Sequence, residues 1–326
     1  MAANSSSAKV IYAALIGNLL VAFTKAGAAA WTGSSAMFSE AIHSFVDTGN
    51  QVLLLYGMRR AKLQADPDHP IGYGRELYFW SFIVAILVFA LGAVVSIYQG
   101  ILHVKEPEPI RDAFVNEVVL GLAFVFESAS WWVALKHFKA IKGMQSYYAA
   151  FRSSKDPPAF VGLFEDSAAL IGIVIAAIGT VAASRFGLPV LDGVASIFIG
   201  LVLAATAILL ARESKSLLIG ERADQLLSDS LLRIAEVASP NVKANGVLTV
   251  QLAPDQILAA LSLEFPDAMR VPEVEAAVAE IERQVRAAHP EVLTLFIKPQ
   301  TSAAFKEAVR LRFGGKPVEL SVVVHP

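Results

Sequence analysis

Six long apolar segments dominate the chain and constrain its fold more than any other feature of the sequence. Each contains roughly 20 or more residues, the length that an α-helix needs to cross the hydrocarbon core of a bilayer. They lie near residues 10–31, 35–58, 77–102, 114–138, 159–184 and 189–211. The sequence therefore predicts a membrane-embedded, all-α bundle of six transmembrane helices.

The composition supports a membrane location and narrows the chemistry. Of 326 residues, 55% are hydrophobic and 17% charged, and the mean hydropathy is +0.56, too apolar for a soluble domain of this length. A net charge of -2 argues against a general nucleic-acid binder. Because the chain has no cysteine, disulfides, thiolate metal sites and cysteine nucleophiles are excluded. Any metal must be held by histidines and carboxylates.

Lysine and arginine are distributed unevenly between the connections. Two connections are rich in them: Arg59, Arg60, Lys62 and Arg75 in one, and Lys136, Lys139, Lys142, Arg152 and Lys155 in the other. The opposite connections carry few: Lys105, Arg111 and Arg185. By the positive-inside rule, both termini are expected to be cytoplasmic. Residues 1–9 lack a convincing signal-peptide cleavage site and resemble no transit segment, so a retained first span in a bacterial inner membrane is expected.

A soluble domain is expected after Arg212, which divides the chain into a transmembrane domain, 1–212, and a cytoplasmic domain, 213–326. Periodicity there predicts helices at 224–238 and 271–288 and strands at 248–253, 256–265 and 292–298. The order α-β-β-α-β predicts a two-layer α/β domain with two helices covering one sheet. The tail has a candidate helix at 303–313 and a strand-like stretch at 322–324.

Two ionisable residues in the second apolar segment, His43 and Asp47, are the strongest functional signal. A separation of four residues places both on one helical face. Such groups are costly in lipid and, when they occur, usually face the bundle interior or an ion pathway. Imidazole and carboxylate are also metal ligands. The pair therefore indicates a metal site within the membrane.

A family resemblance follows from these residues together with three other motifs. They are the loop His69-Pro-Ile-Gly-Tyr-Gly-Arg-Glu76, the sixth segment opening at Leu191-Asp192-Gly, and the stretch Lys215-Ser-Leu-Leu-Ile-Gly-Glu221. With the six spans and the small α/β domain, they resemble the cation diffusion facilitator family of divalent-metal exporters. The resemblance extends to about Pro299. The run Asp47-Thr-Gly-Asn-Gln and the Glu165-Asp166 pair are similar to the branch containing the organellar zinc transporter of animals.

The resemblance implies a transport site shared by the second and fifth spans. Asp166 lies a few residues into the fifth apolar segment, with no lysine or arginine near it along the helix. Because an unpaired carboxylate does not stay ionised in lipid, a cation is its expected partner. The family usually has a second ligand four residues earlier, but here that position is Gly162.

The identity of the fourth ligand stays open at this stage. Zinc prefers four ligands, and His43, Asp47 and Asp166 provide three. The fourth is Glu165, Glu40 or water: Glu40 shares a stripe with His43, whereas Glu165 is rotated by about 100° from Asp166. The resemblance favours Glu165 as compensation for the missing ligand.

The donor set predicts the cargo and the mechanism. An imidazole among carboxylates suits zinc, and the resemblance associates this histidine with zinc preference. Metal and protons compete for the same groups, so we expect proton-coupled antiport by alternating access, with Zn²⁺ as substrate and no cofactor. The resemblance also implies a homodimer. The alternatives are a non-transporting metal-binding partner of a related transporter and a channel. No nucleophile–base arrangement or phosphate loop indicates an enzyme.

Several other polar residues have two interpretations each. Glu127 assists proton transfer or bonds to a neighbouring helix, and Asn50 lines the cytoplasmic entry or joins two helices. Asn18 and Lys25 are candidates to line the pathway, but the favoured interpretation has Asn18 joining two helices and Lys25 extending toward the external surface. Asp192 is expected to be a helix cap rather than a ligand.

Two regions outside the membrane were considered for further metal sites. In the loop after the second span, Asp66 and His69 are candidate ligands, but Tyr73 occupies the position of a second histidine. An alternative role is ordering of a proline-rich turn. In the C-terminal domain, Glu264 alone is too little to hold a metal. His289 is expected to be exposed or to cap a helix end.

Overall fold

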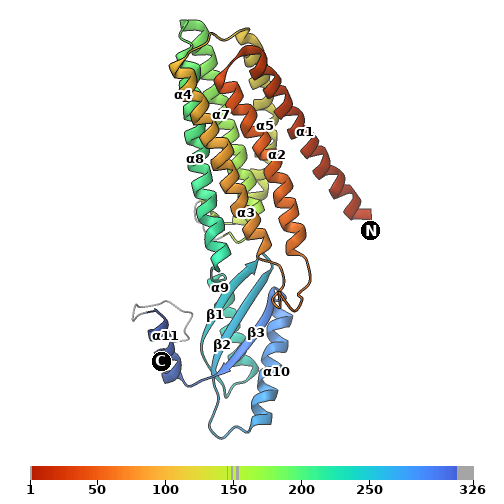
Figure 1. Cartoon of the computed structure of the whole chain (residues 1–326). Helices are drawn as coiled ribbons and strands as arrows, with labels where there is room; N and C mark the ends of the chain where they lie inside the picture. The colour runs from red at the N-terminus through yellow and green to blue at the C-terminus, as the bar shows by residue number, and fades with distance from the viewer. Residues whose placement is uncertain (1, 145, 148–149, 152–153, 314–326) are drawn as a thin grey trace. The chain divides into compact units, whose positions relative to one another are not determined.

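The computed structural model describes residues 2–144, 146–147, 150–151 and 154–313 (Figure 1). The chain divides into two compact units. One contains the chain up to Lys62 and Glu76–Lys215, and the other contains Leu63–Arg75 and the chain from Ser216 on. The first unit is helical, and the second contains a sheet.

The helical unit contains long helices at all six predicted segments. They are α1 (Ala2–Thr32), α2 (Ser35–Ala61), α3 (Glu76–Leu87) continued by η1 (Val88–Ala93) and α4 (Val94–Lys105), α5 (Ala113–Lys142), α7 (Pro157–Phe186) and α8 (Val190–Ile219). Most extend beyond the predicted segments, because the apolar part of a helix marks only the stretch suited to lipid. α8 continues past Arg212, so the predicted domain boundary falls inside a helix.

Within the described residues, four helical stretches are long and apolar enough to cross a membrane. They are Glu76–Lys105, Ala113–Ala140, Phe160–Phe186 and Val190–Ile219. This supports an integral membrane protein. α2 packs beside them, but it carries several polar and charged residues among its apolar ones. The count of six spans therefore stays a prediction.

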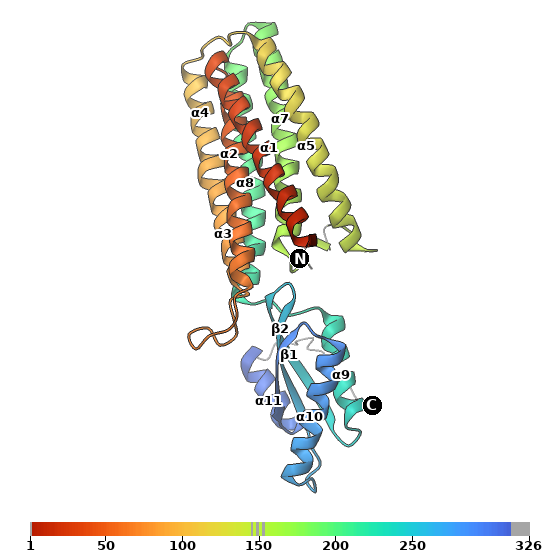
Figure 2. The same cartoon turned by 90° about the vertical axis from the view of Figure 1, so that its right-hand side faces the viewer.

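α2 is central to the packing of the helical unit. It contacts α1, α3, η1, α4 and α7, and α5 packs against α7 and α1 (Figures 1 and 2). The bundle core is formed by small and branched apolar side chains, among them Ala36, Val46, Ile173, Ile199 and Leu203. The buried face of α2 includes polar residues, which therefore lie in the interior of the bundle.

Glycine allows the close approach of α4 and α8. A Cβ atom added at Gly100 would lie 2.7 Å from the carbonyl oxygen of Gly193 and 2.9 Å from the backbone nitrogen of Ile197. A side chain at position 100 would therefore collide with the backbone of α8. Small residues at such crossings let membrane helices pack backbone to backbone.

The second unit has the predicted order α-β-β-α-β. It contains α9 (Gln225–Ala238), β1 (Lys243–Ala253), β2 (Gln256–Glu264), α10 (Val271–Ala288), β3 (Val292–Pro299) and α11 (Ser302–Phe313). β1 and β2 form an antiparallel hairpin, and β3 lies parallel to β2 after the α10 crossover. The candidate tail helix is confirmed as α11, whereas residues 322–324 lie outside the described residues.

The sheet of this unit is covered on both faces. Leu231 of α9 and Ile281 of α10 share a buried core with Ala259, Leu261 and Leu263 of β2. Side chains alternate along a strand, so Ala260 and Ser262 point to the other face. There they line a cavity together with residues of α11. The views in Figures 1 and 2 agree with this placement of α11 opposite α9 and α10.

Candidate functional site: an acidic cavity beside α2

An acidic cavity of about 290 Å³ lies beside α2 in the helical unit. Four carboxylates line it: Asp47 from α2, Glu127 from α5, and Glu165 and Asp166 from α7. Leu54 and Met58 also line it, so it extends along the C-terminal half of α2. The fold therefore brings carboxylates from three helices together around one cavity.

His43 lies next to this cavity but not in its lining. Its side chain is 1% exposed, and its Nδ1 lies 3.4 Å from Oδ1 of Asp47, whose side chain is 15% exposed. Within the described residues, no three histidines or acidic residues lie close enough together to hold a metal.

Two of the cavity carboxylates are held by neutral hydrogen-bond donors from other helices. Asn50 of α2 donates its Nδ2 to Oε1 of Glu165 at 2.7 Å. Ser130 of α5 donates its Oγ to Oδ2 of Asp166 at 2.9 Å. Asn50 therefore joins two helices, one of its two predicted roles, and does so through a candidate ligand.

The role of Ser130 was missed at the sequence level. A signal for it existed, because Ser130 lies three residues after Glu127 and so shares its helical face. Glu127 itself lines the cavity with Asp166. This placement brings Glu127 within the acidic site.

Gly162, where the family usually has a ligand, also lines the cavity. A Cβ atom added there would have no heavy atom within 4 Å. Gly162 and Asp166 are four residues apart on α7 and share a face. The missing ligand has therefore left open space on the wall of the cavity.

Lys25 does not extend to the surface, contrary to the favoured interpretation of the sequence. Its side chain is 0% exposed, and its Nζ lies 3.0 Å from Oε2 of Glu40, which is also 0% exposed. Nζ also donates to Oγ of Ser44 at 2.9 Å. The prediction was wrong because a buried acidic partner on α2 compensates the charge in the interior. Asn18 lines the acidic cavity.

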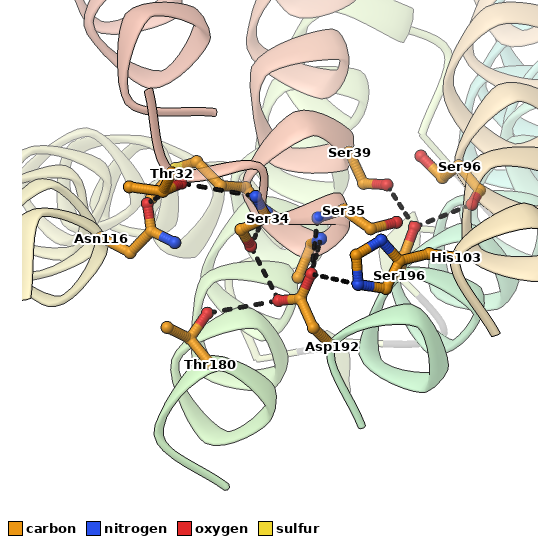
Figure 3. A network of polar contacts seen from close by, with 12 residues as sticks. Thr32, Ser34, Ser35, Ser39, Ser96, His103, Asn116, Thr180, Asp192 and Ser196 are labelled. Carbon is orange, nitrogen blue, oxygen red and sulfur yellow. Dashed lines mark hydrogen bonds and ion pairs between the residues drawn. The ribbon is translucent and has the colours of Figure 1, made fainter. Parts of the chain in front are cut away.

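Asp192 is a cap, as expected, but of a different helix (Figure 3). Although it lies in the first turn of α8, its carboxylate accepts hydrogen bonds from the backbone amides of Ser35 and Ala36, at the start of α2. Its Oδ1 accepts from Oγ of Ser34 at 2.7 Å, and Nε2 of His103 lies 4.0 Å from its Oδ2. A carboxylate at these amides satisfies donors that the helix leaves free.

The loop Leu63–Arg75 uses its candidate ligands to order itself. Asp66 accepts a hydrogen bond at Oδ1 from the backbone amide of His69 at 2.7 Å and at Oδ2 from the hydroxyl of Tyr73 at 2.6 Å. These bonds lower the pKa of Asp66 below its usual value, and the bond from Tyr73 has the larger effect. The geometry favours the turn-ordering interpretation over a second metal site.

Among the described residues, the candidate residues of the C-terminal domain belong to no group of histidines and acidic residues that could hold a metal. His289 ends α10 as its C-cap, as expected from the sequence. Its Nε2 lies 2.7 Å from Oγ of Ser230 and its Nδ1 lies 3.0 Å from Oε1 of Glu291. One ring nitrogen therefore contacts α9, and the other contacts the turn between α10 and β3.

Comparison with known proteins places this helical unit in a family. The model of the cation efflux transmembrane domain matches residues 11–219, which include every residue lining the acidic cavity. The chain belongs to the cation diffusion facilitator family. The resemblance stated from the sequence motifs is thereby confirmed.

Three relatives illustrate the breadth of the similarity to family members. The proton-coupled zinc antiporter SLC30A9, mitochondrial, of Xenopus laevis is 35% identical over 241 residues, covering 72% of this chain and 42% of the relative. Metal tolerance protein C4 of Arabidopsis thaliana is 35% identical over 222 residues, 67% of this chain and 48% of the relative. The metal cation efflux system protein CzcD of Cupriavidus metallidurans is 29% identical over 244 residues, 74% of this chain and 70% of the relative.

The chain spans less than half the length of the first two of these relatives. The similarity to SLC30A9 bears out the predicted branch of the family. This family is one of transporters, consistent with the expectation that the chain is not an enzyme.

Proposed function

We propose that this protein is a divalent metal efflux transporter that carries Zn²⁺ as its substrate in exchange for protons. The observation that carries the proposal is the acidic cavity, in which Asp47, Glu165 and Asp166 line one space with His43 directly behind Asp47. Buried carboxylates are costly to keep ionised unless a cation compensates them, which favours a cation binding in this cavity. The names of the relatives, which include a zinc antiporter and a metal cation efflux protein, support the same function.

The proposed zinc ligands are His43, Asp47, Asp166 and Glu165. Glu165 lines the cavity, where its Oε1 accepts a hydrogen bond from Nδ2 of Asn50. Glu40 instead forms an ion pair with Lys25 and lies outside the cavity lining. This difference favours Glu165 over Glu40 as the fourth ligand. An imidazole with three carboxylates suits zinc better than a site made only of oxygen would.

Proton coupling follows from the chemistry of these groups. A metal binds imidazole only in its neutral form and carboxylates only when they are ionised, so metal binding releases protons. If the site opens alternately to each side of the membrane, an inward proton gradient drives metal outward. Glu127 lines the same cavity and is the proposed further proton carrier.

Flux in reconstituted liposomes containing a zinc dye and a pH dye tests the proposal. Asp47→Asn and Asp166→Asn are expected to abolish zinc flux while the protein stays folded. The matched control, Glu117→Gln, removes an exposed carboxylate of α5 outside the cavity lining and should transport normally. Normal flux in either aspartate variant would remove the site. Zinc flux without proton counter-movement would remove the coupling, and zinc binding without flux would favour the non-transporting partner.

The assembly and orientation belong to the same proposal. We propose a homodimer supported by the C-terminal domain, and a bundle of six spans with both termini in the cytoplasm of a bacterial inner membrane. The relatives include a mitochondrial and a bacterial protein, so the membrane is to be tested directly. Mass measurement in detergent tests the dimer, and reporter enzymes fused to each terminus test the orientation.

A further inference from the structure

A fully buried ion pair lies behind the cavity wall at Ser44, on the side toward the start of α2. Lys25 of α1 and Glu40 of α2 are both 0% exposed, with Nζ and Oε2 3.0 Å apart. The ammonium group also donates to Oγ of Ser44, and Ser44 is part of the cavity wall. The ammonium group is therefore one hydrogen bond away from the cavity, and its positive charge repels a cation that approaches this end.

Glu40 retains a free carboxylate oxygen beyond the ion pair. Its Oε1 is buried and has no hydrogen-bond partner in the described part of the chain. It lies in the space left by Gly172 of α7, where an added Cβ atom would collide with it. A buried carboxylate oxygen without a partner is costly, so Glu40 gains from any cation or donor that reaches this oxygen.

The position of the pair along α2 relates it to the metal site. Glu40 lies three residues before His43, on the same stripe of the helix and away from the C-terminal half that the cavity follows. A metal moving from His43 and Asp47 toward the connection between α1 and α2 would therefore meet Glu40 next. In the described conformation, Oε2 of that carboxylate is paired with Lys25, and only Oε1 is without a partner among the described residues.

We propose that Lys25 is a tethered counter-cation that keeps Glu40 out of the zinc ligand set and blocks the path toward the α1–α2 connection until Glu40 is released. The inference rests on the proposed function, to which it adds Lys25 as a residue that controls the release of zinc. The ammonium group and the metal compete for the carboxylate of Glu40. This competition limits the affinity of the site for zinc and so favours its release. A purely structural pair would instead be replaceable as a unit, because exchanging both partners of a buried ion pair for neutral residues is often neutral for stability, whereas removing one partner is destabilising.

The first test measures zinc affinity by competition with a fluorescent chelator on the detergent-purified full chain. Lys25→Met is expected to bind zinc about tenfold more tightly, because one repulsive charge is lost and Glu40 becomes a ligand. The double variant Lys25→Met/Glu40→Gln should return to within about twofold of wild type. The control Lys105→Met removes a lysine from the last turn of α4 and should leave affinity unchanged.

Equal affinity in Lys25→Met and wild type would overturn the inference and leave the proposed function standing. If Lys25→Met does not fold, flux through the neutral double variant decides: the proposal expects altered flux at normal folding, and wild-type flux would overturn it. The proposed function fails separately, if Asp47→Asn binds and transports zinc normally. The two failures are therefore distinguishable.

Discussion

Restoring a side chain at position 162 should strengthen the proposed zinc site. We expect Gly162→His to lower the zinc dissociation constant. The change is sterically possible because an added Cβ atom would have no heavy atom within 4 Å and would lie on the cavity wall. The new imidazole shares a helical face with Asp166 and would add a second nitrogen ligand, which zinc favours.

The magnitude follows from the gain of one ligand in a space that needs little rearrangement. Loss of even an outer-shell partner typically costs 10–100-fold in metal affinity, so one added ligand should tighten binding by about 10–100-fold, or about 1.4–2.7 kcal/mol. Replacing glycine by histidine in a helix contributes only a few tenths of a kcal/mol to folding, and replacing it by alanine contributes about 1 kcal/mol. A larger gain in affinity therefore reports coordination rather than helix stability. Tighter binding should also slow release, so maximal flux is expected to fall.

Chelator competition and liposome flux on the same purified protein measure both effects. Gly121→His is the matched control, because an added Cβ atom at Gly121 of α5 also meets nothing within 4 Å while the residue lies outside the cavity lining. Gly162→Ala controls for helix propensity. Equal zinc affinities in Gly162→His and Gly121→His would refute the reasoning, because position 162 would then not face the metal.

Three further predictions concern residues outside the proposed zinc ligand set. Gly172→Ala puts a Cβ atom onto Oε1 of Glu40 and should destabilise the helical unit by about 1–3 kcal/mol, whereas Gly27→Ala, with open space around it, should not; equal melting temperatures would contradict this. Asp192→Ala leaves two amides at the start of α2 without their acceptor and should cost about 3 kcal/mol, seen as a melting temperature lowered well beyond that of Thr180→Val. The pKa of Asp66 is lowered, so its carboxylate is ionised and its hydrogen bonds order the loop at pH values above the usual aspartate pKa. These bonds are lost as the pH falls through the lowered pKa. A fluorine-labelled tyrosine in the loop should therefore titrate with a midpoint below about 3.9 and stop titrating in Asp66→Asn; a midpoint above 4 would contradict the expectation.

Much of the fold was predictable from local patterns in the sequence. The apolar segments predicted the positions of the long helices to within a few residues at most ends, and period-two and helical patterns gave the order of α9, β1, β2, α10 and β3. These patterns depend on which residues can face lipid or a core, and that information is local. The start of α1 was missed, because its polar, serine-rich first residues carry no apolar signal.

The candidate site was predictable in part. The sequence identified His43, Asp47 and Asp166 because ionisable groups in lipid require partners. It left Glu165 and Glu40 as alternatives for the fourth ligand, since each lies close to another proposed ligand on its own helix. The contacts across helices separate them: one lines the cavity and the other pairs with a lysine.

The sequence by itself determined the membrane character of the chain, the α-β-β-α-β order of its second unit and the residues of its costliest charges. Only the tertiary structure decided the partners of those charges. Lys25 turns inward to Glu40, and Asp192 caps α2 rather than its own helix. The physical reason is that sequence spacing fixes which residues share a helical face, whereas the packing of one helix against another fixes which faces meet.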